Sequence, residues 1–111
     1  MSSLSTHVLD TMHGRPAADL ALVLSGPTGE IARGRTNADG RCPELAQHGL
    51  APGRYAIVFE VAEYFRAQGV DLPVPPFLDV VTVDFGIAAD GGHYHVPLLV
   101  SPYGYSTYRG S

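Results

Sequence analysis

The sequence is short and weakly charged, which excludes several classes of protein. Its 111 residues suit a single domain over residues 1–111, and a net charge of −4 with 7 basic residues gives no electrostatic basis for binding nucleic acid. Hydrophobic residues form 45% of the chain and charged residues 16%, which excludes an intrinsically disordered protein. No apolar stretch approaches the ~20 residues of a membrane-spanning helix.

Short apolar runs separated by glycine and proline predict a domain built mainly from β-strands. The runs that alternate or are rich in β-branched residues predict strands at residues 3–9, 18–25, 30–36, 54–61, 78–85, 93–100 and 105–109. Residues 62–68, closed by Gly69, form the only credible helix, and the proline-rich residues 72–76 must be a connection. The expected fold is therefore all-β, an antiparallel β-sandwich with one short helix.

The cysteine count and the first residues indicate the compartment. Cys42 is the single cysteine, so no disulfide within the chain can form. Residues 1–6 lack the positive charge and the apolar run of a secretory signal. We therefore expect a cytoplasmic protein in which Cys42 has no special role.

Strand alternation places histidines on the face opposite the core. In residues 93–100, Tyr94 and every second residue after it are apolar, whereas His93 and His95 share the other face. His7 likewise lies opposite the more apolar face of its own strand. In a two-layer sandwich these histidines lie on the outside of a sheet, and alternation alone favours ordinary solvent-exposed side chains.

A histidine pair two residues apart also raises the question of a metal site. Both imidazoles of His93 and His95 point the same way, so adventitious zinc at these residues and His7 is compatible with the pattern. A structural zinc site takes four ligands, and Cys42 with the scattered acidic residues offers no matching set. We expect no required metal and no cofactor.

The C-terminal residues 105–111 are rich in aromatic and arginine side chains. They are compatible with an edge strand that simply stops, and also with a terminus docked against the domain. A docked terminus would bring a free carboxylate, with an intrinsic pKa of ~3.5, to its surroundings.

Three motifs resemble those of one known family. Residues 93–99 (His-Tyr-His-Val-Pro-Leu-Leu) and 101–111 (Ser-Pro-Tyr-Gly-Tyr-Ser-Thr-Tyr-Arg-Gly-Ser) resemble the C-terminal signature of the 5-hydroxyisourate hydrolases, which belong to the transthyretin family. Residues 7–10 (His-Val-Leu-Asp) with 14–17 (Gly-Arg-Pro-Ala) resemble its N-terminal signature. Residues 36–41 resemble its Thr-x-x-Asp-Gly-Arg turn, and residues 63–65 (Glu-Tyr-Phe) are similar to the start of its short helix.

The resemblance implies a fold, an assembly and a site. It implies a transthyretin-like sandwich of two four-stranded sheets, assembled as a homotetramer, a dimer of dimers, with active sites in a channel where outer sheet faces meet. The residues that match the family's catalytic positions are His7, Arg41, His95 and the terminal Ser111. Those that match its substrate-binding positions are His7, Arg41, Tyr108 and Arg109.

The implied reaction is hydrolysis of 5-hydroxyisourate to 2-oxo-4-hydroxy-4-carboxy-5-ureidoimidazoline in urate degradation. Because water is a poor nucleophile, we expect His7 and His95 to share the acid and base work, without a metal ion. Arg41 would hold the polar edge of the substrate and stabilise negative charge, while Ser111 orients a histidine or the water. Which histidine is the base stays open.

Two other functions are compatible with the same fold class. A transthyretin-like carrier would bind a small ligand without catalysis, but it would line its channel with apolar residues in place of His7, Arg41 and His95. An immunoglobulin-like interaction domain would leave the histidines incidental and the C-terminal motif unexplained.

Overall fold

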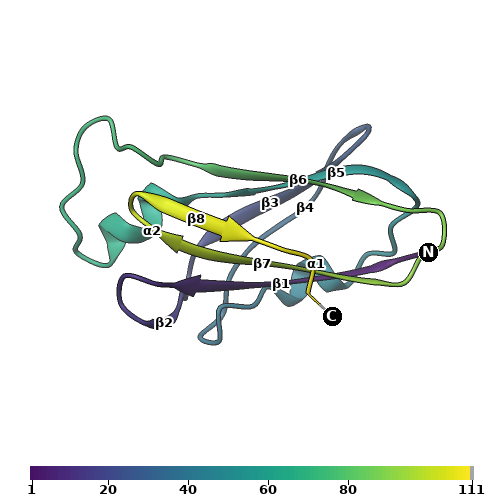
Figure 1. The fold of residues 1–111 in the computed structure, drawn as a ribbon, viewed down its shortest axis with the longest axis horizontal. Helices are drawn as coiled ribbons and strands as arrows, with labels where there is room; N and C mark the ends of the chain where they lie inside the picture. Colours follow the sequence, from purple (N-terminus) through teal and green to yellow (C-terminus); the bar gives the residue numbers. More distant parts are fainter. Residues whose placement is uncertain (111) are drawn as a thin grey trace.

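Two four-stranded β-sheets face each other in the computed structural model, which describes residues 1–110 (Figure 1). The first has the order β2 (Arg15–Pro16), β1 (Ser3–Asp10), β7 (His93–Ser101) and β8 (Gly104–Thr107). The second has the order β4 (Gly29–Arg35), β3 (Ala21–Gly26), β5 (Gly53–Phe59) and β6 (Val81–Ile87). The predicted all-β sandwich of two four-stranded sheets is confirmed.

Two short helices connect the strands, where the sequence predicted one. The helix α2 (Val61–Ala67) lies one residue from the predicted range. The helix α1 (Pro43–Ala46) was missed because a single turn is too short to give a periodic apolar pattern. It begins at a proline and buries only Leu45. Neither helix of residues 1–110 is long and apolar enough to cross a membrane.

The central pair of the first sheet corrects the prediction of a wholly antiparallel sandwich. Strands β1 and β7 are parallel, with a continuous register from Ser3 opposite His93 to Asp10 opposite Val100. Apolar alternation is the same for both strand directions, so it could not give the direction of this pair. The whole second sheet lies between the two strands in the chain, which is the kind of long connection that parallel pairing requires.

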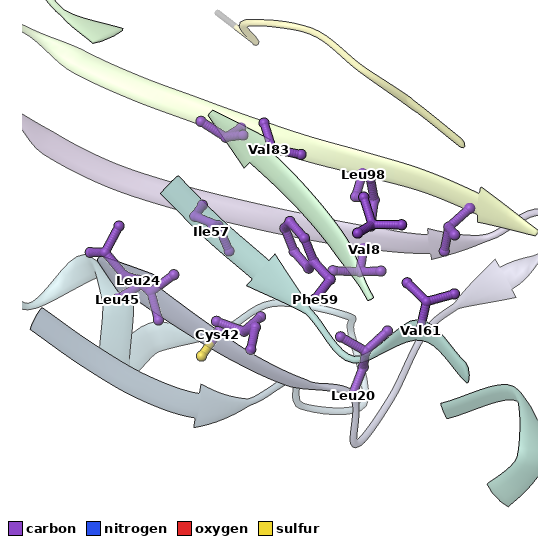
Figure 2. Packing of buried hydrophobic residues seen from close by; sticks show 14 of the residues in the cluster. Val8, Leu20, Leu24, Cys42, Leu45, Ile57, Phe59, Val61, Val83 and Leu98 are labelled. Carbon is purple, nitrogen blue, oxygen red and sulfur yellow. The ribbon is translucent and has the colours of Figure 1, made fainter. Parts of the chain in front are cut away.

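The core fills the space between the two sheets. Figure 2 shows Val8 and Leu98 of the first sheet together with Ile57 and Phe59 of the second, all of them buried. Each such side chain contributes roughly 1.5–3 kcal/mol relative to an exposed one. The side chains that alternation assigned to the core are all buried: Leu4, Thr6, Val8, Tyr94, Val96, Leu98 and Val100. Asp10 is buried as well, and so is Pro97, although its position in the strand belongs to the outer face. The predicted inner and outer faces of these strands are therefore confirmed.

A buried carboxylate ties the end of β1 to α2. Asp10 accepts hydrogen bonds from the Tyr64 hydroxyl at 2.7 Å, from the His13 ring at 2.6 Å and from the His13 amide at 2.9 Å. Burial raises the pKa of Asp10, but the hydrogen bonds from His13 and Tyr64 lower it more, so the net pKa is below its ordinary value. Burial and the nearby carboxylate raise the pKa of Tyr64 to about 12. We call Asp10, His13 and Tyr64 the closed cluster.

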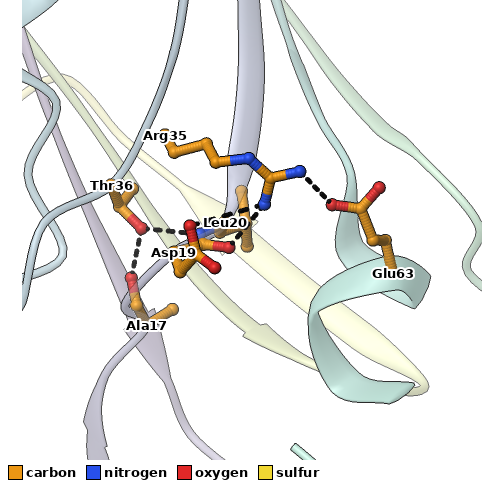
Figure 3. A network of polar contacts seen from close by, with 6 residues as sticks. All are labelled: Ala17, Asp19, Leu20, Arg35, Thr36 and Glu63. Carbon is orange, nitrogen blue, oxygen red and sulfur yellow. Dashed lines mark hydrogen bonds and ion pairs between the residues drawn. The ribbon is translucent and has the colours of Figure 1, made fainter. Parts of the chain in front are cut away.

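A second polar network holds the segment that leads to Arg41 (Figure 3). The buried Thr36 hydroxyl donates to the Ala17 carbonyl at 2.6 Å and accepts from the Leu20 amide at 2.9 Å. The preceding Arg35 is paired with Glu63 of α2 at 2.9 Å. These contacts fix the end of β4 before the chain turns toward the outer face of the first sheet.

Candidate active site

Two histidines lie half-buried on the outer face of the first sheet, on neighbouring strands. In the parallel register Ser5 is opposite His95, and His7 is opposite Pro97. Because every second residue shares a face, His7 and His95 are diagonal neighbours across the β1–β7 pair. The structure therefore brings together two predicted site residues that are 88 positions apart in the sequence.

The loop after Thr36 carries Arg41 to the other side of His7. The Asn37 side chain accepts hydrogen bonds from the amides of Asp39 and Arg41, at 3.0 and 3.1 Å, which closes the loop. The Gly40 carbonyl accepts from the Val8 amide at 2.7 Å, and an isolated bridge pairs His7 with Arg41. Gly40 has a φ of +77°, and a Cβ there would overlap the Val8 carbonyl oxygen, so this loop needs glycine.

The last described residue lies against His95. The Gly110 amide donates to the His95 carbonyl at 2.8 Å, and an isolated bridge pairs the two residues. A Cβ at Gly110 would overlap Cδ2 of the His95 ring, so only glycine allows this approach. Of the two possibilities left open by the sequence, the structure has the docked one for residues up to Gly110. Ser111 lies outside the described residues, and its role stays a prediction.

Arg109 lies against Tyr94 and not beside the imidazoles of the outer face. Its guanidinium lies 3.9 Å from the centre of the Tyr94 ring and donates to the His93 carbonyl at 3.2 Å. The Tyr94 side chain is buried on the inner side of the sheet, whereas His95 is on the outer side. The structure therefore does not bring the Arg109 guanidinium to the histidines of the outer face. Tyr108 is 60% exposed.

Two serines that belong to none of the predicted site residues complete a hydrogen-bonded row along the outer face. The Ser5 hydroxyl lies 2.7 Å from Nδ1 of His95 and 2.8 Å from Nε2 of His93. The Ser3 hydroxyl lies 2.6 Å from Nδ1 of His93. Strand alternation put both serines on the face of His7, but only the parallel register with β7 places them beside the other histidines.

The electrostatic surroundings keep His95 neutral. Burial, and then the positive charges of Arg41, His7 and His93, lower the pKa of the His95 imidazole below its ordinary value. In residues 1–110 no acidic side chain forms a salt bridge with any of these four residues. We call His7, Arg41, His93 and His95 the outer-face cluster. The uncharged His95 imidazole, present at neutral pH, is the form that accepts a proton.

The described residues contain no cluster arranged to hold a metal ion, and the one cysteine is not an activated thiol. The described part of the chain contains no group of three or more histidine, cysteine or acidic side chains arranged to hold a metal ion, so His7, His93 and His95 do not form one. Cys42 is buried, and its burial together with the nearby Glu44 carboxylate raises the pKa of its thiol. A thiol with a raised pKa is a weak nucleophile.

Comparisons with known proteins identify the family of this chain. A sequence model described as the HIUase/Transthyretin family matches residues 4–110. The chain belongs to this family. A 5-hydroxyisourate hydrolase of Ralstonia nicotianae is 54% identical to it over 117 aligned residues, which cover 100% of both chains. The resemblance read from the sequence is therefore confirmed.

Solved structures of the family superpose closely on this fold. A Klebsiella pneumoniae 5-hydroxyisourate hydrolase has a TM-score of 0.87 at 37% identity and covers 100% of both chains. An (S)-allantoin synthase has a TM-score of 0.91 at 41% identity, covering 99% of this chain and 44% of its own. Sea bream transthyretin in complex with thyroxine has a TM-score of 0.84 at 32% identity, covering 97% of this chain and 94% of its own. The same fold thus occurs in a 5-hydroxyisourate hydrolase and in a transthyretin in complex with thyroxine.

Proposed function

We propose that this protein hydrolyses 5-hydroxyisourate to 2-oxo-4-hydroxy-4-carboxy-5-ureidoimidazoline, a step of urate degradation. The observation that carries the proposal is the outer-face cluster, in which a neutral His95 lies diagonal to His7, beside Arg41 and the C-terminal Gly110. The names and identities of the relatives support the substrate.

The chemistry follows from the weakness of water as a nucleophile and of an amide nitrogen as a leaving group. One histidine takes a proton as water attacks the ring carbonyl, and a proton is returned to the ring nitrogen when the C–N bond breaks. His7 and His95 share these two steps. Arg41 holds the polar edge of the substrate and stabilises the negative oxygen that forms. The reaction is hydrolysis of a cyclic amide, with no step assigned to a metal ion.

The C-terminal residues have separate roles in this proposal. Ser111 follows Gly110, and its carboxylate or hydroxyl orients a histidine or the attacking water. Tyr108 is exposed and contacts the substrate. Arg109 positions the tail through its contact with Tyr94, and a contact between Arg109 and the substrate requires the guanidinium to leave that ring.

The proposal includes a homotetramer, a dimer of dimers, in which outer faces of the first sheet meet. Leu9 and Leu99 lie opposite each other on this face and are only half-buried in one chain. Packing against another copy would remove these apolar side chains from water and enclose the histidines in a channel. A molecular mass of about four chains in sedimentation or light scattering supports this assembly, and a monomer contradicts it.

The location and domain organisation belong to the same proposal. We propose a cytoplasmic enzyme of one domain. The continuous core shared by the two sheets supports a single folding unit, and a buried free thiol at Cys42 is suited to a reducing compartment.

A coupled assay tests the proposed activity. Urate and urate oxidase generate 5-hydroxyisourate, and its decay is followed by ultraviolet absorbance with and without the purified protein. We expect the decay to be much faster with the protein, and slower in a His7→Ala/His95→Ala variant that keeps its folded circular-dichroism spectrum. Decay at the spontaneous rate contradicts the proposal, and thyroxine binding under those conditions would favour the alternative, a transthyretin-like carrier.

A second experiment tests the role of the tail. Adding a few residues after Ser111 is expected to reduce turnover sharply while the melting temperature stays unchanged. Full activity in the extended protein would contradict the role given to the terminus. The same extension placed before Met1 is the control.

A further inference from the structure

A continuous hydrogen-bonded row of four side chains runs along the outer face, and three of them have no role in the proposed mechanism. It runs from Ser3 to His93, then to Ser5 and then to His95, with contacts of 2.6, 2.8 and 2.7 Å. The row alternates hydroxyls and imidazoles, and it leads from the half-buried His95 to the exposed His93. Every link is within hydrogen-bond distance.

We propose that the Ser5 hydroxyl is a positioning residue that sets the tautomer of His95 and passes a proton between His95 and His93 during the reaction. This inference rests on the proposed hydrolase function, because it explains how the His95 tautomer that acts as a base is stabilised and which residue takes the positive charge afterwards. His93 and Ser5 have no role in the mechanism as stated above.

The number of protons available restricts the row to two arrangements. The Ser5 hydroxyl has one proton, so it donates to one of its two imidazole neighbours and accepts from the other. In the first arrangement Nδ1–H of His95 donates to Ser5, and Ser5 donates to Nε2 of His93. In the second, Nε2–H of His93 donates to Ser5, and Ser5 donates to Nδ1 of His95. The tautomers of His93 and His95 are therefore coupled through Ser5.

The first arrangement prepares His95 as a base. With its proton on Nδ1 and held by Ser5, the other ring nitrogen, Nε2, carries a free lone pair for the proton of the attacking water. A neutral His93 then carries its proton on Nδ1 and donates it to Ser3. All three hydrogen bonds of the row are made in this state.

Proton transfer along the row moves the charge and leaves every atom balanced. When Nε2 of His95 takes a proton from water, the Nδ1 proton moves to the Ser5 oxygen as the Ser5 proton moves to Nε2 of His93. His95 is then neutral with its proton on Nε2, and His93 is the cation. The reverse transfer restores Nδ1–H as Nε2 of His95 gives its proton to the departing ring nitrogen.

The direction of this transfer follows from the surroundings of the two rings. His95 is half-buried, and the charged or titratable groups that face it are Arg41 from the loop, His7 from β1 and His93 from its own strand. All of them are basic, so a positive charge on His95 is unfavourable. His93 is less buried by its own chain than His95, so its imidazolium keeps more hydration and the charge is better tolerated there.

Site-directed variants separate this relay from a purely structural role. Ser5→Ala is expected to lower kcat roughly 10- to 100-fold with KM changed by less than about threefold, since proton transfer is affected more than substrate binding. Ser5→Thr keeps the hydroxyl on a strand position and should restore most of the rate. His93→Ala should have the effect of Ser5→Ala, and the double variant should be no slower than either single one, because both remove the same row.

Ser3→Ala is the matched control. Ser3 accepts from Nδ1–H of His93 in the first arrangement and donates to Nδ1 of a neutral His93 in the second, and water can replace it at an exposed position in either role. This variant should therefore keep its rate within about threefold. Near-wild-type rates in Ser5→Ala or His93→Ala would overturn the proposal. So would losses in kcat that multiply in the double variant.

Nitrogen NMR of the imidazole rings tests the row without substrate. In the ¹⁵N-labelled protein we expect neutral His95 and His93 to carry their protons on Nδ1. In Ser5→Ala both rings should shift toward the Nε2–H form that prevails in water. In Ser3→Ala, where water can replace the hydroxyl, both rings should keep their protons on Nδ1. Unchanged ring shifts in Ser5→Ala would overturn the inference. A wild-type protein that shows this coupling but fails to hydrolyse 5-hydroxyisourate would contradict the proposed function and leave the coupling standing.

Discussion

Two histidine clusters lie on opposite sides of β1, and the same residue type serves different purposes in them. In the closed cluster, His13 and Tyr64 donate to the buried Asp10 carboxylate. In the outer-face cluster, His7 and His95 have Arg41 as their charged neighbour, and no acidic side chain of residues 1–110 pairs with them. The first is an assembly of matched donors and acceptors, whereas the second has an excess of positive charge.

The difference indicates which cluster is built for stability and which for chemistry. The Asp10 carboxylate accepts three hydrogen bonds, holds the β1–β2 turn against α2 and is shielded from solvent. An imidazole whose pKa is lowered by burial and by neighbouring cations is neutral at pH 7, so it can accept a proton from water. Changes in the two clusters should therefore separate activity from stability.

The largest effect is expected from His95→Ala. We expect kcat to fall by ~10² or more, because a base in direct contact with the reacting proton is lost, with a change in unfolding free energy under about 1 kcal/mol. His13→Ala is the matched variant of the closed cluster and should keep kcat while lowering the free energy of unfolding. The coupled assay and urea denaturation measure both quantities. Loss of activity in His13→Ala would remove the distinction between the clusters.

Tyr64→Phe is expected to be the next largest change, and it acts on stability alone. It removes a hydrogen bond to a buried carboxylate, which should lower the unfolding free energy by about 2 kcal/mol. Urea denaturation gives this value, and kcat should be unchanged. Tyr105→Phe, at an exposed position of β8, is the control and should change stability by less than about 0.5 kcal/mol. Equal effects of the two substitutions would contradict the structural role of the closed cluster.

Gly110→Ala tests the approach of the tail to His95. The added methyl group would overlap the His95 ring, so the ring or the tail must move, and we expect kcat to fall roughly 10-fold because catalytic groups tolerate little displacement. Gly104→Ala is the control, since a Cβ there meets its nearest neighbour at 3.9 Å. A wild-type kcat in both variants would contradict the importance of the close approach of Gly110 to His95.

The smallest expected effect is a shift in pH dependence. Arg41 is one of the positive charges that lower the pKa of His95, so Arg41→Gln should raise that pKa. A base with a higher pKa becomes protonated, and inactive, at a higher pH as the solution is acidified. The acid limb of kcat/KM should therefore move to higher pH, in addition to any loss of rate. Arg15→Gln, on β2, is the control and should leave the limb in place; an unmoved limb in Arg41→Gln would contradict the electrostatic account of His95.

The pH dependence of folding has a defined sign in each cluster. The folded pKa of Asp10 lies below its unfolded value, so its contribution to stability is present above the unfolded pKa and is lost as the pH falls through the folded pKa. The folded pKa of His95 is also lowered, so below pH ~6.5 the unfolded chain binds protons more readily and stability falls. For both groups the free energy of unfolding falls as the pH is lowered, and the fall occurs at lower pH for Asp10 than for His95.

The local sequence pattern was sufficient to predict the longer elements and the faces of β1 and β7. Alternation in residues 93–100 depends only on the chain's own geometry, so it assigned Tyr94 to the core and His95 to the outer face correctly. The helix at Val61–Ala67 was predicted within one residue because it spans enough turns for its pattern and its closing glycine to show. The one-turn α1 and the two-residue β2 are too short to give such a signal.

The sequence by itself determined that the histidines lie outside the core and, through its motifs, which family the chain resembles. Only the tertiary structure decided which residues lie next to them. The parallel pairing of β1 with β7 puts Ser5 between His93 and His95, and the turn of the tail sends Arg109 toward Tyr94 while Gly110 rests on His95. Strand direction and contacts between residues some ninety positions apart depend on how the whole core packs. The local alternation of apolar and polar residues is the same whether two strands pair parallel or antiparallel.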